Sequence, residues 1–139
     1  MRVFLDTNII IDFYAAREQY YRPAAVLIDL AERKEIEIAV SATTFVNAFY
    51  LLRRQFNSAE LYRSMRALAD LCVITPIDKV IIEKALSLDW VDFEDCAQTI
   101  SAESVKADVI VTRNVKDFQG SNLLVQTPID FLNEYFSKH

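Results

Sequence analysis

Short apolar segments alternate with helical segments along the whole chain, and this alternation is the feature that most constrains the fold. The segments that have the length and composition of strands cover residues 2–5, 36–40, 71–74, 109–111 and 123–125. The stretches between them carry apolar residues at helical spacing. Strands separated by helices form parallel sheets, because a parallel connection needs a crossover. We therefore expect an α/β fold, a three-layer α/β/α sandwich with a mostly parallel, about five-stranded sheet.

The ends of the expected helices are marked by capping residues. A side-chain oxygen just before a helix can accept a hydrogen bond from one of its free backbone N–H groups. Residues of this kind that precede helical segments are Ser41, Ser58, Asp78 and Asp92. Proline suits the first turn of a helix, so Pro23 and Pro128 are expected to mark two further helix starts.

Length and composition indicate a single folded domain, residues 1–139. The 53% hydrophobic content supports one packed core, and the net charge of −5 is the wrong sign for bulk attraction to nucleic acid. The longest uncharged stretch, 38–52, is shorter than the ~20 residues of a membrane span. We expect a cytoplasmic protein in which Cys72 and Cys96 are reduced core residues, with one disulfide as the alternative.

Polar residues lie where the predicted strands end and where the adjoining helices begin. Asp6 ends the first strand, Asn47 lies in the second turn of the helix after the second strand, and Asp95 lies in the first turn of a later helix. Asn114 and Asp117 follow the fourth strand. Strand carboxyl ends and helix N-termini share one edge of a parallel sheet, so we expect these side chains to face one crevice.

Composition limits the chemistry of that crevice. The only histidine is the last residue, His139, and the only glycine is Gly120. A Ser-His-Asp triad and a glycine-rich phosphate loop are therefore disfavoured. Two carboxylates ~4 Å apart repel by a few kcal/mol, which calls for a cation. Oxygen ligands without sulfur or imidazole suit Mg²⁺ or Mn²⁺, ions that activate water and hold phosphate oxygens.

Three motifs of the chain resemble the PIN domain family. They are Leu5–Asn8, Asp92–Ala97 and Val111–Phe118, in this order. The resemblance covers essentially the whole chain and is closest to bacterial PIN proteins of the VapC toxin type. It implies an endoribonuclease that depends on Mg²⁺ or Mn²⁺ and has an acidic pocket. It also implies an RNA substrate, a small protein antitoxin as partner, and a homodimer.

The resemblance assigns roles to individual residues. Asp6 matches the first metal-binding aspartate of the family, Asp95 the aspartate that opens the late helix, and Asp117 the acidic residue of the final loop, preceded by the polar Asn114. We expect Asp6, Asp95 and Asp117 to hold the metal. Asn47, expected to join them in the catalytic site, departs from the pattern because the family usually has glutamate there. An amide offers a neutral oxygen, so weaker metal binding is expected.

Several of these residues have a structural alternative. Asp6 could begin an Asx turn, and the side chain of Asp95 would interact well with the helix dipole. Asn47 could equally be a core amide bonded to Thr43 one turn back. Acids that could supply the charge missing at Asn47 are Asp12, Asp92 and Glu94.

Basic and polar side chains are expected to hold RNA phosphates around the pocket. They are Arg54, Arg113, Lys116 and Asn114. Arg54 follows Asn47 by about two helical turns, and this spacing would place both on one helix face.

The leading hypothesis is thus a metal-dependent endoribonuclease, the toxin of a toxin–antitoxin pair. The alternative is a weakly active or inactive PIN-like module that binds RNA or a metal, and Asn47 motivates it. A receiver-like phospho-acceptor domain is disfavoured, because the chain lacks the additional early acidic cluster and the lysine after the last strand that this design uses.

Overall fold

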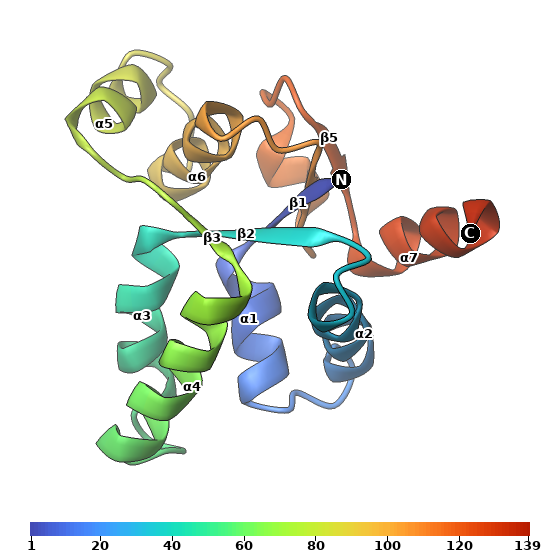
Figure 1. Cartoon of the computed structure of the whole chain (residues 1–139). Helices are drawn as coiled ribbons and strands as arrows, with labels where there is room; N and C mark the ends of the chain where they lie inside the picture. The colour runs from blue at the N-terminus through green and yellow to red at the C-terminus, as the bar shows by residue number, and fades with distance from the viewer.

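The computed structural model describes residues 1–139 and confirms the predicted α/β class (Figure 1). The strands are β1 (Arg2–Leu5), β2 (Glu37–Ser41), β3 (Val73–Thr75), β4 (Val109–Val111) and β5 (Leu124–Gln126). The helices are α1 (Thr7–Tyr14), α2 (Tyr21–Glu32), α3 (Ala42–Leu52), α4 (Ser58–Leu71), α5 (Lys79–Leu86), α6 (Phe93–Ser104) and α7 (Pro128–Lys138). One 3-10 turn, η1 (Val115–Phe118), follows β4.

The five strands form one sheet in the order β3-β2-β1-β4-β5. Every neighbouring pair is parallel, with Val3 of β1 opposite Ile38 of β2 on one side and Val109 of β4 on the other. The chain winds outward from β1 to β3 and then returns to the other side of β1 at β4. The direction of winding therefore reverses between β1 and β4, and the crevice beyond the carboxyl ends of these two strands is where such folds bind ligands.

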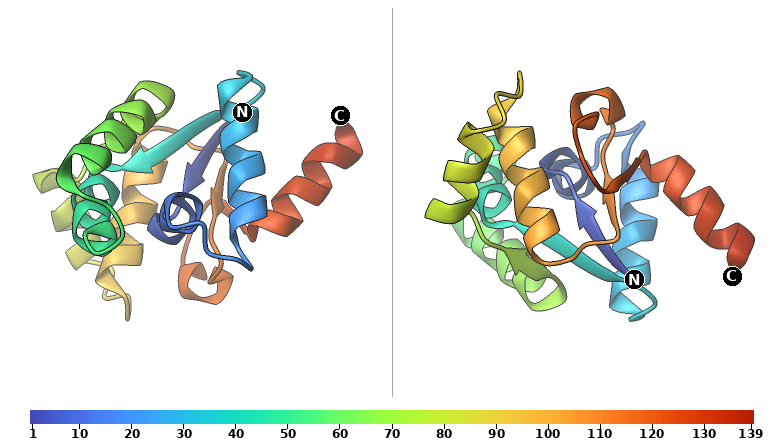
Figure 2. Two further views of the ribbon diagram at one scale, coloured as in Figure 1. Left: turned by 90° about the horizontal axis from the view of Figure 1, so that it is seen from below. Right: turned by 90° about the horizontal axis from the view of Figure 1, so that it is seen from above.

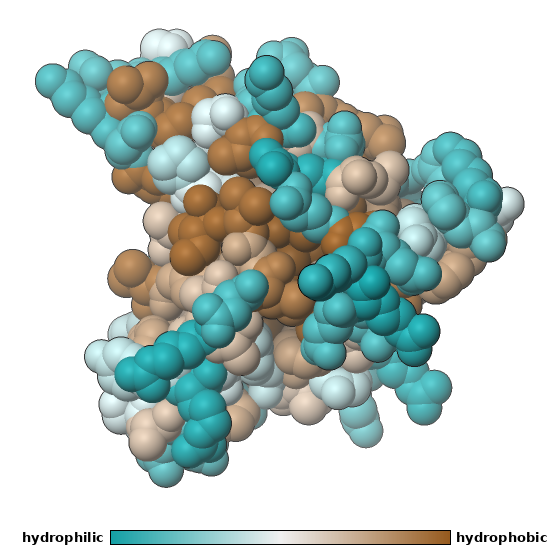
Figure 3. All heavy atoms as spheres, viewed as in Figure 1, coloured by the Kyte–Doolittle hydropathy of each residue, from teal (hydrophilic) through white to brown (hydrophobic).

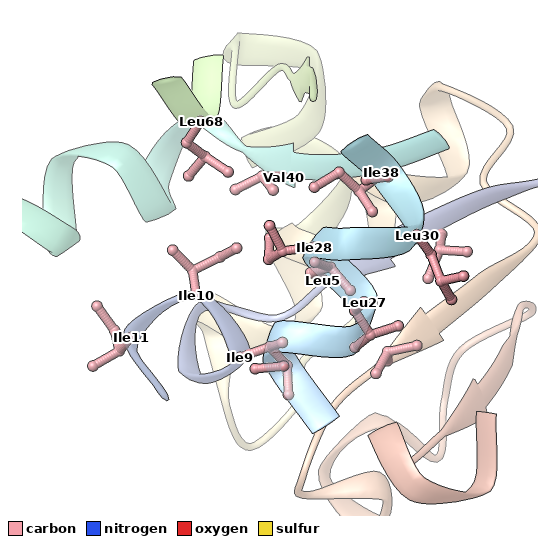
Figure 4. Close-up of a cluster of buried hydrophobic side chains, with 14 of the residues drawn as sticks. Leu5, Ile9, Ile10, Ile11, Leu27, Ile28, Leu30, Ile38, Val40 and Leu68 are labelled. Atoms are coloured by element: carbon pink, nitrogen blue, oxygen red, sulfur yellow. The ribbon is translucent and has the colours of Figure 1, made fainter. Parts of the chain in front are cut away.

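The two faces of the sheet are covered by apolar cores of unequal size. Figure 1 shows α1–α4 on one side of the strands and α5 and α6 on the other. Figure 2 shows α7 at one end of the molecule, where it packs beside α2. Val3 and Leu5 point into the larger core of 22 buried residues, whereas Phe4 between them points into a cluster of 6. In the larger core, side chains of α1 and α2 meet those of β1 and β2 (Figure 4).

The thinner face holds α6 firmly against the sheet. Its cluster combines small residues, Ala39 and Ala102, with the large side chains of Phe4, Ile110 and Phe118. A separate apolar cluster joins α6 to α5. Because α6 is fixed on two sides, the polar residues near its N-terminus are held at a defined position relative to the end of β1.

Most of the predicted helix starts are confirmed. The side chains that accept a hydrogen bond from the backbone N–H three residues on are Ser41, Asp78 and Asp92. The prediction for Ser58 is wrong. Asn57 caps α4 instead, accepting from the N–H of Glu60 at 2.8 Å, while the Glu60 carboxylate accepts from the N–H of Asn57 at 2.9 Å. This reciprocal pair satisfies two backbone donors at once, and a cap at Ser58 would forgo it.

The structure also bears on the expectations for the cysteines, for membrane spans and for a homodimer. Both cysteines are free; Cys96 is buried and Cys72 is partly buried. No helix has the length and hydropathy to cross a membrane. Figure 3 shows apolar side chains gathered across the middle of one face, over β2 and β3, and Ile74 of the edge strand β3 is 46% exposed. Homodimer formation stays a prediction.

The packing of the smaller apolar cluster between α6 and the sheet can be tested by substitution. We expect Ala102→Leu to lower the free energy of unfolding by about 1–3 kcal/mol, because the fully buried Ala102 leaves no space for three more carbon atoms beside Phe4 and Phe118. Urea unfolding measures it, with Ala59→Leu on the exposed side of α4 as the control, where the change should stay within about 0.5 kcal/mol. Equal stability of the two variants would contradict the assignment of Ala102 to a tight layer.

Candidate functional site

One pocket at the carboxyl edge of the sheet brings together residues from four separate segments of the chain. It has a volume of about 320 Å³. The predicted residues that line it are Asp6, Asn47, Asp95, Asn114 and Asp117, and the further acids are Asp92 and Glu94. The crevice therefore lies where β1 and β4 end, with one wall from α3 and the other from α6.

Asp6 forms the buried end of this pocket. It is 4% exposed, and its carboxylate accepts hydrogen bonds from the Thr112 hydroxyl at 2.8 Å and from the Gln98 amide at 3.3 Å. The Thr112 oxygen also accepts from the backbone N–H of Asn114 at 3.1 Å. Asp6 makes no side-chain cap on α1, so the Asx-turn alternative is wrong. Its carboxylate is instead oriented by the loop after β4 and by α6.

Burial raises the pKa of three acids of the pocket, and neighbouring charges add to this for Glu94 and Asp95. Burial raises the pKa of Asp6, and the Thr112 hydroxyl opposes this. Burial, followed by the charges of Asp6, Asp92, Asp117 and Glu94, raises the pKa of Asp95 to about 7. No lysine or arginine lines the pocket to offset these charges. The arrangement concentrates negative charge beyond what the protein itself neutralises.

The donors in the pocket fit a hard divalent cation. They are carboxylate, amide and hydroxyl oxygens, which Mg²⁺ and Mn²⁺ prefer. No three acidic side chains converge closely enough here to enclose one ion directly. Mg²⁺ commonly keeps several of its waters, so carboxylates can hold it through them. The assignment of Asp6, Asp95 and Asp117 as metal ligands stays a prediction.

Asn47 faces the pocket from α3 and not the core. Its side chain is partly buried and makes no hydrogen bond within the protein, so the alternative of a core amide bonded to Thr43 is wrong. The buried hydroxyl of this turn belongs to Thr44, which contacts the hydroxyl of Thr7 at 2.7 Å and that of Ser41 at 3.2 Å. These contacts tie the start of α1 to the start of α3 and leave the Asn47 amide free.

Arg113 points away from the pocket. Its Nε donates to the carboxylate of Asp12 at 2.8 Å, and its guanidinium lies 4.0 Å from the centre of the Tyr20 ring. Asp12 is fully buried and also pairs with Arg17. In this structure the Arg113 guanidinium is therefore paired with a buried carboxylate, and that it contacts RNA stays a prediction. Asp12 does not line the pocket and cannot compensate for Asn47.

The other predicted basic contacts lie in different places. α3 ends at Leu52, so Arg54 lies beyond the helix and does not share a face with Asn47; the argument from helical spacing is wrong. Lys116 is exposed on η1 and lines an adjoining hollow. That Arg54, Lys116 and Asn114 contact RNA stays a prediction.

Gln98 is the residue of the site that the sequence reasoning missed. It lies one turn after Asp95 on α6, is 1% exposed, and its Oε1 has no hydrogen-bond partner. The available signal was a long polar side chain on the buried face of a helix, one turn from a candidate ligand. Thr112 is a second such residue, and the hydrogen bond that its hydroxyl donates to Asp6 gives it a definite position in the site.

Comparison with known proteins agrees with this geometry. A family model described as "PIN domain" matches residues 2–116. "Ribonuclease VapC1" of Aquifex aeolicus (strain VF5) is 22% identical over 139 residues, which cover 96% of this chain and 95% of that protein. The chain is thus distantly similar to a VapC ribonuclease over nearly its full length.

Solved structures share the fold. A toxin–antitoxin complex from Klebsiella pneumoniae has a TM-score of 0.67 and 24% identity, covering 91% of this chain and 97% of that chain. The structure of VapBC-1 from nontypeable Haemophilus influenzae has a TM-score of 0.66 and 24% identity, covering 93% of this chain and 99% of that chain. Since the family match spans most of the sequence and the fold agrees, the chain belongs to the PIN domain family.

Proposed function

We propose that the chain, acting as a single domain of residues 1–139, is an endoribonuclease that uses Mg²⁺ or Mn²⁺ to hydrolyse RNA phosphodiester bonds. The observation that carries this proposal is the acidic pocket at the ends of β1 and β4, which Asp6, Asp95 and Asp117 all line and which no lysine or arginine lines. Membership of the PIN family and the distant similarity to a VapC ribonuclease support it.

The residues of the pocket would have different roles in the reaction. A bound Mg²⁺ or Mn²⁺ supplies a water of lowered pKa and neutralises charge on the phosphate oxygens. Asp6, Asp95 and Asp117 would hold the ion or its waters. Thr112 and Gln98 fix the orientation of the Asp6 carboxylate through the hydrogen bonds that they donate. The Asn47 amide, free of protein partners, can orient a water on the α3 side of the pocket.

A protein partner fits the same pocket. One similar structure is described as a toxin–antitoxin complex, and we extend that assignment to this chain as the toxin of such a pair in the cytoplasm. The pocket lacks its own cation, so a basic side chain of a small antitoxin inserted there would pair with the acids and displace the metal. A homodimer is proposed on the same family resemblance.

The second candidate function is a module that binds RNA or a metal without turnover. Asn47 favours it, because an amide stands where the family usually has a carboxylate and one ligand charge is lost. Asp92 and Glu94 line the pocket and bring carboxylates to it from the other wall. The two candidates therefore differ in whether the remaining acids suffice for hydrolysis.

Cleavage assays test the leading proposal. With Mn²⁺ present, we expect the protein to cut RNA, and we expect Asp6→Asn to lower the rate by roughly 100-fold or more, because it removes a buried charge next to the reacting phosphate. Lys34→Gln, in the turn before β2 at the opposite edge of the sheet, is the control and should cut normally. Undiminished cutting by the double variant Asp6→Asn/Asp95→Asn, or cutting in excess chelator, would rule the mechanism out.

Asn47→Glu separates the two candidates. A carboxylate at this position adds a charged oxygen to the pocket, so calorimetric titration should show tighter Mn²⁺ binding and the cleavage rate should rise. Cutting by the unsubstituted protein supports the nuclease. Cutting that appears only in the variant identifies the natural chain as the inactive module.

A further inference from the structure

The acidic pocket continues into a second hollow of about 480 Å³. Asp92 and Asp117 line both spaces and form the ridge between them. The other side chains that the argument uses are Trp90, Val91, Lys116 and Gly120, and we call this group the tryptophan shelf. A molecule bound at the acidic pocket can therefore extend directly onto the shelf.

The indole of Trp90 is held at the wall of the hollow by a close contact. Trp90 is the only tryptophan of the chain and Gly120 is the only glycine. A Cβ atom at Gly120 would lie 2.6 Å from Cζ2 of Trp90, so only glycine permits the present separation. Gly120 has no positive φ, and its role is therefore this close approach and not an unusual backbone conformation.

The rest of the shelf combines a free cation with exposed apolar surface. Lys116 is exposed on η1 and forms no ion pair. Val91 is fully exposed next to Trp90. A ring that can stack, an apolar rim and an unpaired ammonium are together the groups that bind a nucleotide with its base out of a helix.

The neighbouring carboxylates determine which part of the nucleotide lies where. Asp92 and Asp117 repel phosphate unless a cation stands between them, so a phosphate is favoured over the acidic pocket with its ion and not on the ridge alone. The uncharged base can lie against Trp90. Lys116, which lines the same hollow, can pair with the next phosphate of the RNA.

We propose that the tryptophan shelf binds one unpaired nucleotide of the RNA, next to the phosphate held at the acidic pocket. The inference rests on the proposed function and deepens it, because it assigns the residues that hold the nucleotide next to the cut. Bases in a duplex are already stacked and paired, and reaching Trp90 would cost their unstacking.

Trp90 also packs against the two smaller apolar clusters, so a test must separate binding from stability. The single tryptophan makes this possible without substitution at the shelf, because all indole fluorescence arises there. In a stopped-flow experiment read before any cleavage, we expect a short unpaired RNA to quench the emission of the natural protein saturably in the presence of Mn²⁺, and a duplex of the same composition to leave it unchanged.

Variants then measure the contribution of each group to affinity for labelled unpaired RNA. Trp90→Leu keeps apolar bulk but removes stacking, and should weaken binding by roughly 5- to 150-fold, whereas Trp90→Phe should retain most of it. Gly120→Ala should displace the indole, shift its emission and weaken binding. Lys116→Gln should lower the salt dependence of log K by about 0.7, with Lys34→Gln unchanged as the matched control.

The outcomes distinguish this inference from the proposed nuclease. Cleavage of unpaired RNA by the natural protein with no change in indole emission would overturn the shelf and leave the nuclease standing. If the natural protein shows quenching, Trp90→Leu binds RNA more weakly and no cleavage is seen, the shelf is supported as a binding surface and the nuclease is rejected. If Trp90→Leu fails to fold, the emission of the unsubstituted tryptophan and the Lys116→Gln salt dependence still decide.

Discussion

The pairing of β1 with β4 is the contact on which the candidate site depends. Leu5 lies opposite Val111, and the backbone N–H of Asp6 donates to the carbonyl of Val111 at 3.0 Å. This register places the Asp6 carboxylate beside the Thr112 hydroxyl. A slip of one residue would turn Asp6 to the other face of the sheet, away from α6 and Gln98. Strand pairing, rather than any local motif, therefore assembles the acids.

Two aspartates are buried, and they differ in whether their partners are charged or neutral. Asp12 is fully buried, and Arg113 and Arg17 supply its counter-charge, so it serves the packing of α1 against the loop after β4. Asp6 receives hydrogen bonds only from neutral donors and shares the pocket with four further acids and three amides. A charge left without a partner is costly to folding, and a protein keeps such a group where a ligand completes it. Only the second arrangement has the character of a site.

Local patterns in the sequence predicted the fold, and they predicted which polar residues would line one pocket. Short apolar runs between helical stretches predicted the parallel sheet, and the positions of Asp6 and Asp95 relative to those runs predicted a shared edge. The same patterns could not show which partner a long side chain selects. Arg113 has equal access in sequence to the pocket and to Asp12, and the buried carboxylate decided it. Gln98 was missed because its role arises from α6 packing over the end of β1, a contact between residues far apart in the chain. Arg54 was misplaced because α3 ends earlier than expected.

Thermal unfolding at mildly alkaline pH tests the central claim, that the fold confines carboxylates whose repulsion a divalent cation relieves. Without metal, Asp95→Asn should melt at a higher temperature than the natural protein, since it removes the carboxyl whose pKa burial and its neighbours raise to about 7. Mn²⁺ should raise the melting temperature of the natural protein and raise that of Asp95→Asn much less, while Asp70→Asn on exposed α4 should behave like the natural protein. A lower melting temperature for Asp95→Asn, together with an unchanged response to Mn²⁺, would contradict the account.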